Sequence, residues 1–104
     1  MSDYLIEITE SAQSDLRQII YYIQTDLSSP STADNFMNGI EEAMEQLSFM
    51  LEKFQLVRDD YLASKGYRST RYKNYLIFYI INYHMQTVFI HRILPASRHW
   101  EYLI

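Results

Sequence analysis

The spacing of hydrophobic positions changes along the chain from that of a strand to that of helices and back to strands. Tyr4, Ile6 and Ile8 alternate with polar residues, so this segment is predicted to form a strand with one apolar face. Thr9 follows as a candidate helix N-cap, with an acidic residue in the favourable first turn. A short strand leading directly into a helix is therefore expected.

Two amphipathic helices are predicted next. Apolar residues recur at spacings of three and four from Ala12 to about Leu27, and again from Ala33 to about Leu51. The break at residues 28–31 holds a serine that can cap and a proline suited to the first helical position. Because this connection is short, the helices are expected to be antiparallel neighbours. Acidic residues off the second apolar stripe are expected to face solvent: Asp34, Glu41, Glu42, Glu45 and Glu52.

The C-terminal part has the spacing of strands. An irregular segment is expected from Phe54 to Lys65, followed by a turn at Gly66. Three strands are then predicted over residues 67–72, 75–81 and 87–94, joined by hairpin-length connections. The second is apolar throughout, so it should be central and covered on at least one face. The predicted fold is α+β: an N-terminal strand, an antiparallel two-helix hairpin, then a C-terminal antiparallel three-strand meander forming one sheet.

Length and composition favour a single intracellular domain. The 104 residues suffice for one hydrophobic core, so residues 1–104 are expected to form one domain. The absence of cysteine excludes disulfides and thiolate chemistry. Apolar runs fall short of the ~20 residues that cross a bilayer, and the N-terminus lacks the features of a signal peptide. A cytoplasmic protein without membrane contact is expected.

The charge is distributed unevenly. Residues 61–104 carry six Lys/Arg and one acidic residue, whereas residues 1–60 carry three Lys/Arg and twelve acidic residues. The predicted sheet region is therefore basic and the helical region acidic, although the net charge is −4. The net charge alone argues against a polyanionic partner. The separation of charge leaves the basic half able to meet one.

Metal and cofactor chemistry find no support in the sequence. His84, His91 and His99 lack the spacing of metal ligands, so neither a metal site nor a cofactor is expected. A glycine-rich phosphate loop and a nucleophile elbow are also missing. His91 lies within an apolar strand and is expected to be a hydrogen-bonded structural residue. His84 is expected in a turn.

Three motifs, in this order, resemble the RelE/ParE family of bacterial toxins. They are Tyr4-Leu5-Ile6-Glu7-Ile8-Thr9, then Arg68-x-x-Arg71-x-x-x-Tyr75-Leu76-Ile77-Phe78-Tyr79, then Val88-Phe89-Ile90-His91-Arg92-Ile93-Leu94 followed by Ser97-Arg98-His99. With the helices between them, the resemblance covers nearly the whole chain. It implies the toxin half of a type II toxin–antitoxin system, which arrests growth and is neutralised by a cognate antitoxin. Plasmid stabilisation is a further role that the family implies.

The two branches of the family imply different targets. Toxins like ParE poison DNA gyrase, whereas those like RelE and YoeB cut messenger RNA in the ribosomal A site. The ribonuclease branch usually has an arginine just after the first aromatic residue or histidine of the central strand. Leu76 stands at that position and favours the gyrase branch, but Arg98, His99 and Tyr102 are typical of the nuclease branch. A third alternative is a relative that binds an antitoxin without any activity.

The resemblance places the functional surface on the basic strands and the tail. In a nuclease, Arg71, Lys73 and Arg98 would stabilise the phosphate, and His99 would transfer a proton because histidine titrates near pH ~6.5. Under either target, residues expected to contact the target or antitoxin are Arg68, Arg71, Lys73, Arg92, Arg98, Trp100 and Tyr102. Tyr102 is also suited to stacking on a base or donating a proton.

Strand geometry refines this expectation. Strand alternation puts Arg71 and Lys73 on one face and Arg68 on the other, provided that the strand reaches Lys73. Arg98 is expected to converge with them, because antiparallel strands bring those ends together. The alternative for Arg68 and Arg71 is pairing with helix acids. The alternative for Trp100 is packing of the tail against the domain or the antitoxin.

Overall fold

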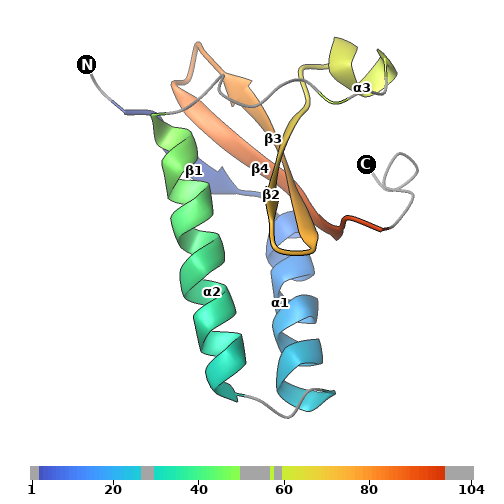
Figure 1. Cartoon of the computed structure of the whole chain (residues 1–104). Coiled ribbons are helices and arrows are strands. Elements are labelled where there is room, and N and C mark those ends of the chain that lie inside the picture. Colours follow the sequence, from blue (N-terminus) through green and yellow to red (C-terminus); the bar gives the residue numbers. More distant parts are fainter. Residues whose placement is uncertain (1–2, 27–29, 50–56, 58–59, 98–104) are drawn as a thin grey trace.

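The computed structural model places two long helices against one face of a β-sheet (Figure 1). It describes residues 3–26, 30–49, 57 and 60–97. The elements in these residues are β1 (Leu5–Ile8), α1 (Glu10–Thr25), α2 (Pro30–Glu45), the 3-10 helix η1 (Gln46–Ser48), α3 (Asp60–Ser64), β2 (Arg68–Tyr72), β3 (Tyr75–Asn82) and β4 (Thr87–Pro95). The predicted α+β order of strand, helix hairpin and antiparallel meander is confirmed.

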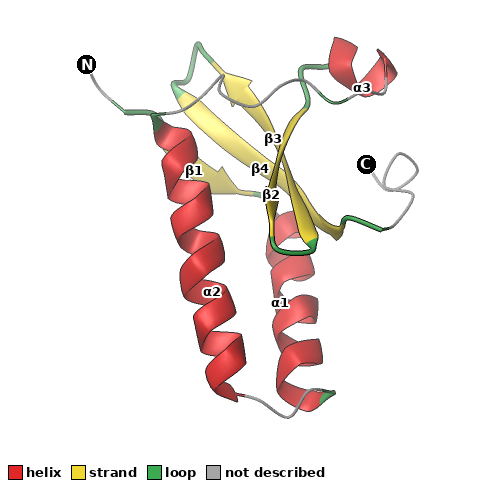
Figure 2. Cartoon of the chain, in the orientation of Figure 1, coloured by secondary structure: helices red, strands yellow, loops and turns green. Residues whose placement is uncertain are grey.

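The sheet in the described part of the chain has the strand order β1-β4-β3-β2 (Figure 2). β3 pairs antiparallel with both β2 and β4, so the apolar second strand of the meander is interior, as predicted. β1 pairs in parallel with β4, with Leu5 opposite Thr87 and Ile8 opposite Ile90. The chain from α1 to β3 forms the long connection that a parallel pairing of β1 with β4 requires. The sheet is therefore mixed, with β1 and β2 at its edges.

The main core lies between the helix hairpin and one face of the sheet. Thr9 caps α1, since its side chain accepts a hydrogen bond from the backbone N–H of Ala12. The alternating residues Tyr4, Ile6 and Ile8 pack against this core with the face that their spacing predicted. Its buried members are Ala12, Leu16, Ile19, Ile23, Ala33, Phe36, Ile40, Met44, Leu47, Ile77, Tyr79, Val88, Ile90 and Ile93.

Gly39 lets α2 approach β2 closely. The ring of Tyr72 packs edge-on against Phe36, with ring centroids 5.4 Å apart. The hydroxyl of Tyr72 fills the space that a Cβ at position 39 would need, and its Cζ would lie 2.6 Å from such a Cβ. The absence of a side chain at Gly39 therefore sets the separation between helix and sheet edge.

The ends of the helices differ slightly from the sequence expectations. α1 ends at Thr25 rather than about Leu27, with Asp26 as its C-cap. α2 ends at Glu45 and continues as η1 to Ser48, while residues 50–51 of the expected helix lie outside the described residues. Four of the five acidic residues expected to face solvent are exposed: Asp34, Glu41, Glu42 and Glu45; Glu52 is not among the described residues.

The prediction of an irregular segment before Gly66 was wrong for Asp60–Ser64, which form α3. A five-residue helix is too short to show a helical repeat in the sequence. α3 covers part of the sheet face opposite the long helices, which we call the outer face. Its Leu62 packs there with Phe78 and Leu94 in a second, smaller core that also includes Val57 and Tyr67.

Candidate functional site

The basic residues of β2 lie on opposite faces of the sheet. Arg68 is opposite Tyr79 and Arg71 is opposite Leu76 on β3. Directly opposed residues share a face, and Tyr79 belongs to the main core, so Arg68 lies on the helix side and Arg71 on the outer face. This separation was predicted. Lys73 is not part of the strand: it lies in the two-residue turn after β2 with φ of 53°, so strand alternation does not determine its direction.

The guanidinium of Arg71 is oriented by the turn beside it. Its Nε donates a hydrogen bond of 2.8 Å to the backbone carbonyl of Lys73. Arg71 is exposed, and no ion pair with a helix acid is formed by it within the described residues. Arg71 is thus an exposed cation whose Nε is held by the turn.

The end of β4 lies beside Arg71. The backbone N–H of Ala96 donates to the carbonyl of Asn74 at 2.8 Å, which fixes the strand end against the β2–β3 turn. A hollow of about 330 Å³ forms here, lined by Arg71, Asn74, Tyr75, Pro95, Ala96 and Ser97. Antiparallel pairing therefore brings the chain at Ser97 to Arg71, while the predicted convergence of Arg98 itself stays a prediction. The other predicted site residues Arg98, His99, Trp100 and Tyr102 lie outside the described residues.

Arg92, which was expected to face a target or antitoxin, is bound to α1. Its Nε donates to Asp15 Oδ2 at 2.8 Å and its Nη2 donates to Oδ1 at 2.9 Å. The backbone N–H of Ile93 donates to the same carboxylate at 2.9 Å. These hydrogen bonds raise the pKa of the Arg92 guanidinium. Asp15 is buried and the Arg92 side chain is 25% exposed. Arg92 therefore pairs with an acid of its own chain.

The same region of β4 contains an irregularity at His91. Ile90 is opposite Tyr79 and Arg92 is opposite Phe78, so His91 is the extra residue of a β-bulge. Its Nδ1 lies 3.3 Å from the hydroxyl of Tyr67. This hydrogen bond agrees with the expected structural role. Burial lowers the pKa of the His91 imidazole, which favours its neutral form near pH 7.

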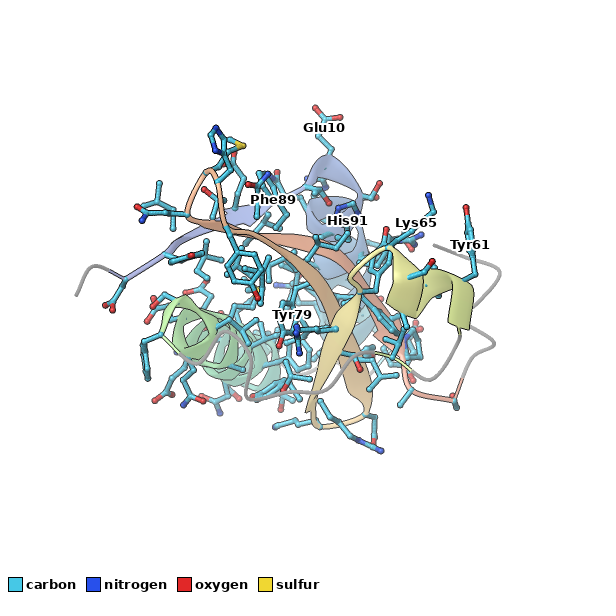
Figure 3. All side chains as sticks on the ribbon, turned by 90° about the horizontal axis from the view of Figure 1, so that it is seen from above. Glu10, Tyr61, Lys65, Tyr79, Phe89 and His91 are labelled. Atoms are coloured by element: carbon cyan, nitrogen blue, oxygen red, sulfur yellow. The ribbon has the colours of Figure 1, made fainter. Side chains whose placement is uncertain are left out.

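Aromatic and basic side chains surround the hydrogen bond between His91 and Tyr67. The two rings meet edge-on with centroids 5.3 Å apart. Figure 3 shows Tyr61 and Lys65 on the side of α3, near the strand that carries His91. The Lys65 ammonium lies 5.1 Å from the centroid of the Tyr61 ring. Burial raises the pKa of the Tyr67 hydroxyl, so this phenol is a hydrogen-bonding group rather than a ready proton donor.

The described outer face keeps the groups needed for RNA cleavage apart. Cleavage by a 2′-hydroxyl requires a base, an acid and positive charge around one phosphate. Arg71 and His91 lie two strands apart, roughly 10 Å across the sheet at ordinary strand spacing, and His91 lies three positions along β4 from Leu94, the residue in register with Arg71. The residues of β3 and β4 in register with Arg71 are Leu76 and Leu94, which are both apolar. Arg71 and His91 therefore do not converge on one phosphate within the described residues.

Asp15 and Tyr67 were not identified as important from the sequence. A signal for Asp15 was present, because it follows Ala12 by three residues and precedes Ile19 by four, which places an acid within an apolar stripe. Tyr67 had no comparable signal, since its partner His91 is far away in the sequence. The described residues contain no group of three or more His, Cys, Asp or Glu able to hold a metal ion. They also contain no helix long and apolar enough to cross a membrane.

Comparisons with known proteins identify the family. The family model described as the ParE toxin of the type II toxin–antitoxin system parDE matches residues 6–100. A comparison with curated proteins found no match. The chain belongs to this ParE toxin family of type II toxin–antitoxin systems. The resemblance seen in the sequence is thereby confirmed at the level of the family.

Solved structures share the fold across most of their length. The chromosomal ParDE toxin–antitoxin system from P. aeruginosa includes a chain 17% identical, with a TM-score of 0.73 over 90% of this chain and 97% of that one. A chain of the RelBE2 complex from Mycobacterium tuberculosis is 21% identical, with a TM-score of 0.63 over 89% of this chain and 98% of that one. The isolated E. coli RelE toxin is 16% identical, with a TM-score of 0.55 over 96% of this chain and 92% of that one. ParE and RelE proteins thus share this fold, and the fold does not select between their targets.

Proposed function

We propose that this chain is a growth-arresting toxin that acts by ParE-like binding to DNA gyrase and is neutralised by a cognate antitoxin. The observation that carries the choice of target is Leu76. It lies on the outer face opposite both Arg71 and Leu94, at the position where the resemblance to the ribonuclease branch implies an arginine. A leucine there can bury apolar surface but cannot stabilise charge developing on a phosphate.

The distribution of charge supports a protein target. The exposed acidic residues of α2 contribute no attraction to the ribosome, which is a polyanion. Arg92, the cation of β4, is engaged by Asp15. Among the described residues, these features leave Arg71 and Lys73 exposed at the β2–β3 turn and Lys65 exposed after α3, a smaller basic surface than a nucleic-acid partner usually needs.

A ribosome-dependent messenger RNA endonuclease is the second candidate. The hollow that brings Ser97 next to Arg71 favours it, because the chain continues from there into Arg98 and His99. In that case, Arg71, Lys73 and Arg98 would stabilise the phosphate and His99 would transfer the proton. An antitoxin-binding relative without activity is the third alternative.

Two reactions run side by side test the target. The purified chain is added to a gyrase supercoiling reaction and to a cell-free translation reaction in which RNA ends are mapped. We expect supercoiling to be inhibited and the RNA to stay intact, with weaker inhibition by Arg71→Ala than by the matched control Arg17→Ala on α1. Codon-positioned cuts that vanish in Arg98→Ala would overturn the gyrase proposal. Inactivity in both reactions, together with normal growth on expression, would support the third alternative.

The proposed antitoxin partner rests on family membership and on solved relatives that are toxin–antitoxin complexes. A type II antitoxin is expected to be encoded beside its toxin. Co-expression with the neighbouring short reading frame should restore growth, and the two products should co-purify. Continued growth arrest without complex formation would contradict this part of the proposal.

A further inference from the structure

We propose that the face of α1 and α2 turned away from the sheet is a self-complementary surface through which two copies of this chain associate. A hollow of about 370 Å³ lies at its centre, and the described residues that line it are Leu16, Arg17, Ile20, Tyr21, Gln24 and Met37. All of them belong to the two helices. Figure 1 shows α1 and α2 side by side, with the end of α1 and the start of α2 extending past the sheet. The surface is thus separate from the basic β2–β3 turn and from the residues proposed to act on a target.

The centre of this surface is apolar and incompletely covered. Tyr21 is 69% exposed, while Ile20 and Met37 are only partly buried against the main core. A tyrosine at an interface buries a large ring and keeps its hydroxyl at the edge, which is why tyrosine is common there. Covering these side chains would remove apolar surface from water and so favour association.

Polar groups of opposite character flank the apolar centre on the two helices. Arg17 and Gln24 line the hollow from α1 and lie two helical turns apart. Asp34 and Glu41 lie three residues before and four residues after Met37, so they share its side of α2. All four flanking residues are exposed, and Arg17 and Glu41 form no ion pair within the described part of the chain. α1 thus presents hydrogen-bond donors, and α2 presents carboxylates.

A two-fold axis parallel to the helices makes these groups meet. Because α1 and α2 are antiparallel, Arg17 and Glu41 flank one end of the hollow, and Gln24 and Asp34 flank the other. Such an axis places α1 of each copy against α2 of the other, at the same level along the helices. Arg17 of each copy then faces Glu41 of the other, and the Gln24 amide donates to Asp34. This match of the surface with itself favours a second copy over an unrelated partner.

The size of the surface indicates a reversible dimer. A helix of 16 residues is about 24 Å long, and two such helices side by side are about 20 Å wide. The face therefore covers roughly 500 Å² on each copy, compared with about 800 Å² per partner in a stable complex. We expect a dimer that dissociates on dilution.

The test is sedimentation velocity of the purified full chain over a hundredfold range of protein concentration. The wild type should pass from monomer to dimer as its concentration rises. Tyr21→Ala removes the apolar centre and Arg17→Glu places carboxylates opposite each other, so each should raise the dissociation constant at least tenfold. The matched controls are Tyr61→Ala on α3 and Glu42→Arg, which lies five residues from Met37 on another side of α2. Both controls should stay within twofold of the wild type.

A mixture of two charge variants tests the pairing itself. Arg17→Glu alone brings like charges together twice in a dimer, and so does Glu41→Arg alone. An equal mixture of the two variants restores both ion pairs in a heterodimer, which native mass spectrometry identifies by its mass. The heterodimer should form at concentrations at which each variant alone is monomeric. The double variant Arg17→Glu/Glu41→Arg in one chain should dimerise like the wild type.

A wild-type chain that is monomeric throughout the range would overturn the proposal. Dimers that persist unchanged in Tyr21→Ala and Arg17→Glu would do the same, and so would a mixture that forms no heterodimer. Circular dichroism and urea unfolding of each variant identify any loss of fold. For a variant that fails to fold, Tyr21→Ser and Arg17→Gln replace the original substitutions, with the same expected direction.

Discussion

The Asp15 carboxylate joins α1 to β4 by accepting hydrogen bonds of 2.8 and 2.9 Å from Arg92. β1 ends at Ile8, opposite Ile90, so β4 has no neighbouring strand on this side beyond that point. Asp15 accepts the backbone N–H of Ile93, while Thr9 Oγ1 donates to the carbonyl of His91 at 3.1 Å. The start of α1 thus supplies hydrogen bonds that a longer β1 would otherwise make.

Removing Asp15 should cost more stability than removing its arginine partner. Asp15→Ala leaves both the Arg92 guanidinium and the buried N–H of Ile93 without their acceptor, which should cost about 2–3 kcal/mol of unfolding free energy. Arg92→Met leaves the bond from Ile93 intact and should cost about 1 kcal/mol. Urea unfolding measures both. An equal or larger loss for Arg92→Met would contradict this account of Asp15.

Gly39→Ala should destabilise the packing of α2 on β2. The added Cβ would overlap the Tyr72 side chain, whose ring is held against Phe36. Overpacking of this kind costs about 1–3 kcal/mol, which exceeds the gain of about 1 kcal/mol from replacing glycine in a helix. The double variant Gly39→Ala/Tyr72→Leu should lose less than the sum of the single variants. Thermal or urea unfolding that shows Gly39→Ala to be more stable than the wild type would refute the close approach.

Lys73→Gly should stabilise the β2–β3 hairpin. Lys73 is the first residue of a two-residue turn and has φ of 53°, a backbone conformation that glycine adopts without a steric penalty. Both common two-residue hairpin turns require a positive φ at this position. We expect the free energy of unfolding, measured with urea, to increase by about 0.5–1 kcal/mol. This value includes the larger entropy of glycine in the unfolded chain, which offsets part of the gain. The bond from Arg71 to the backbone carbonyl at position 73 is retained, so a net loss of stability would argue against this turn geometry.

His91 should make stability fall as the solution becomes acidic. Burial lowers its pKa in the folded state, so the unfolded chain binds a proton more readily below pH ~6.5. The stability of the fold with neutral His91 is complete above the pKa that histidine has in the unfolded chain. It is lost as the pH decreases through that pKa, because the unfolded chain then takes up the proton first. His91→Gln should therefore show a smaller decrease in the urea midpoint between pH 7.5 and 5.5 than the wild type. The exposed His84→Gln variant is the control and should keep the full decrease.

Tyr79 should oppose stability at alkaline pH. Its burial raises its pKa to about 12, above the value of about 10 for an unfolded tyrosine. The unfolded chain therefore releases this proton first, and stability is lost as the pH rises from about 10 toward 12. Tyr79→Phe should lose less stability than the wild type between pH 8.5 and 10.5, measured by urea unfolding. A parallel decline of the two proteins would contradict the assignment.

The sequence determined the type and order of the main elements. Alternation at Tyr4, Ile6 and Ile8 and the helical spacing after Ala12 are local patterns, and each element must bury the apolar side that its own spacing creates. The interior position of β3 followed from its continuous apolar sequence for the same reason. The opposite directions of Arg68 and Arg71 were equally local, because three positions along a strand reverse the face.

Only the tertiary structure decided how distant segments combine. The parallel partner of β1, the packing of α3 on the outer face and the binding of Arg92 by Asp15 all join residues far apart in the chain. Spacing along the sequence carries no information about which distant acid meets which arginine. Arg92 therefore looked like a surface cation, whereas folding gave it a buried carboxylate as its partner and left Arg71 exposed.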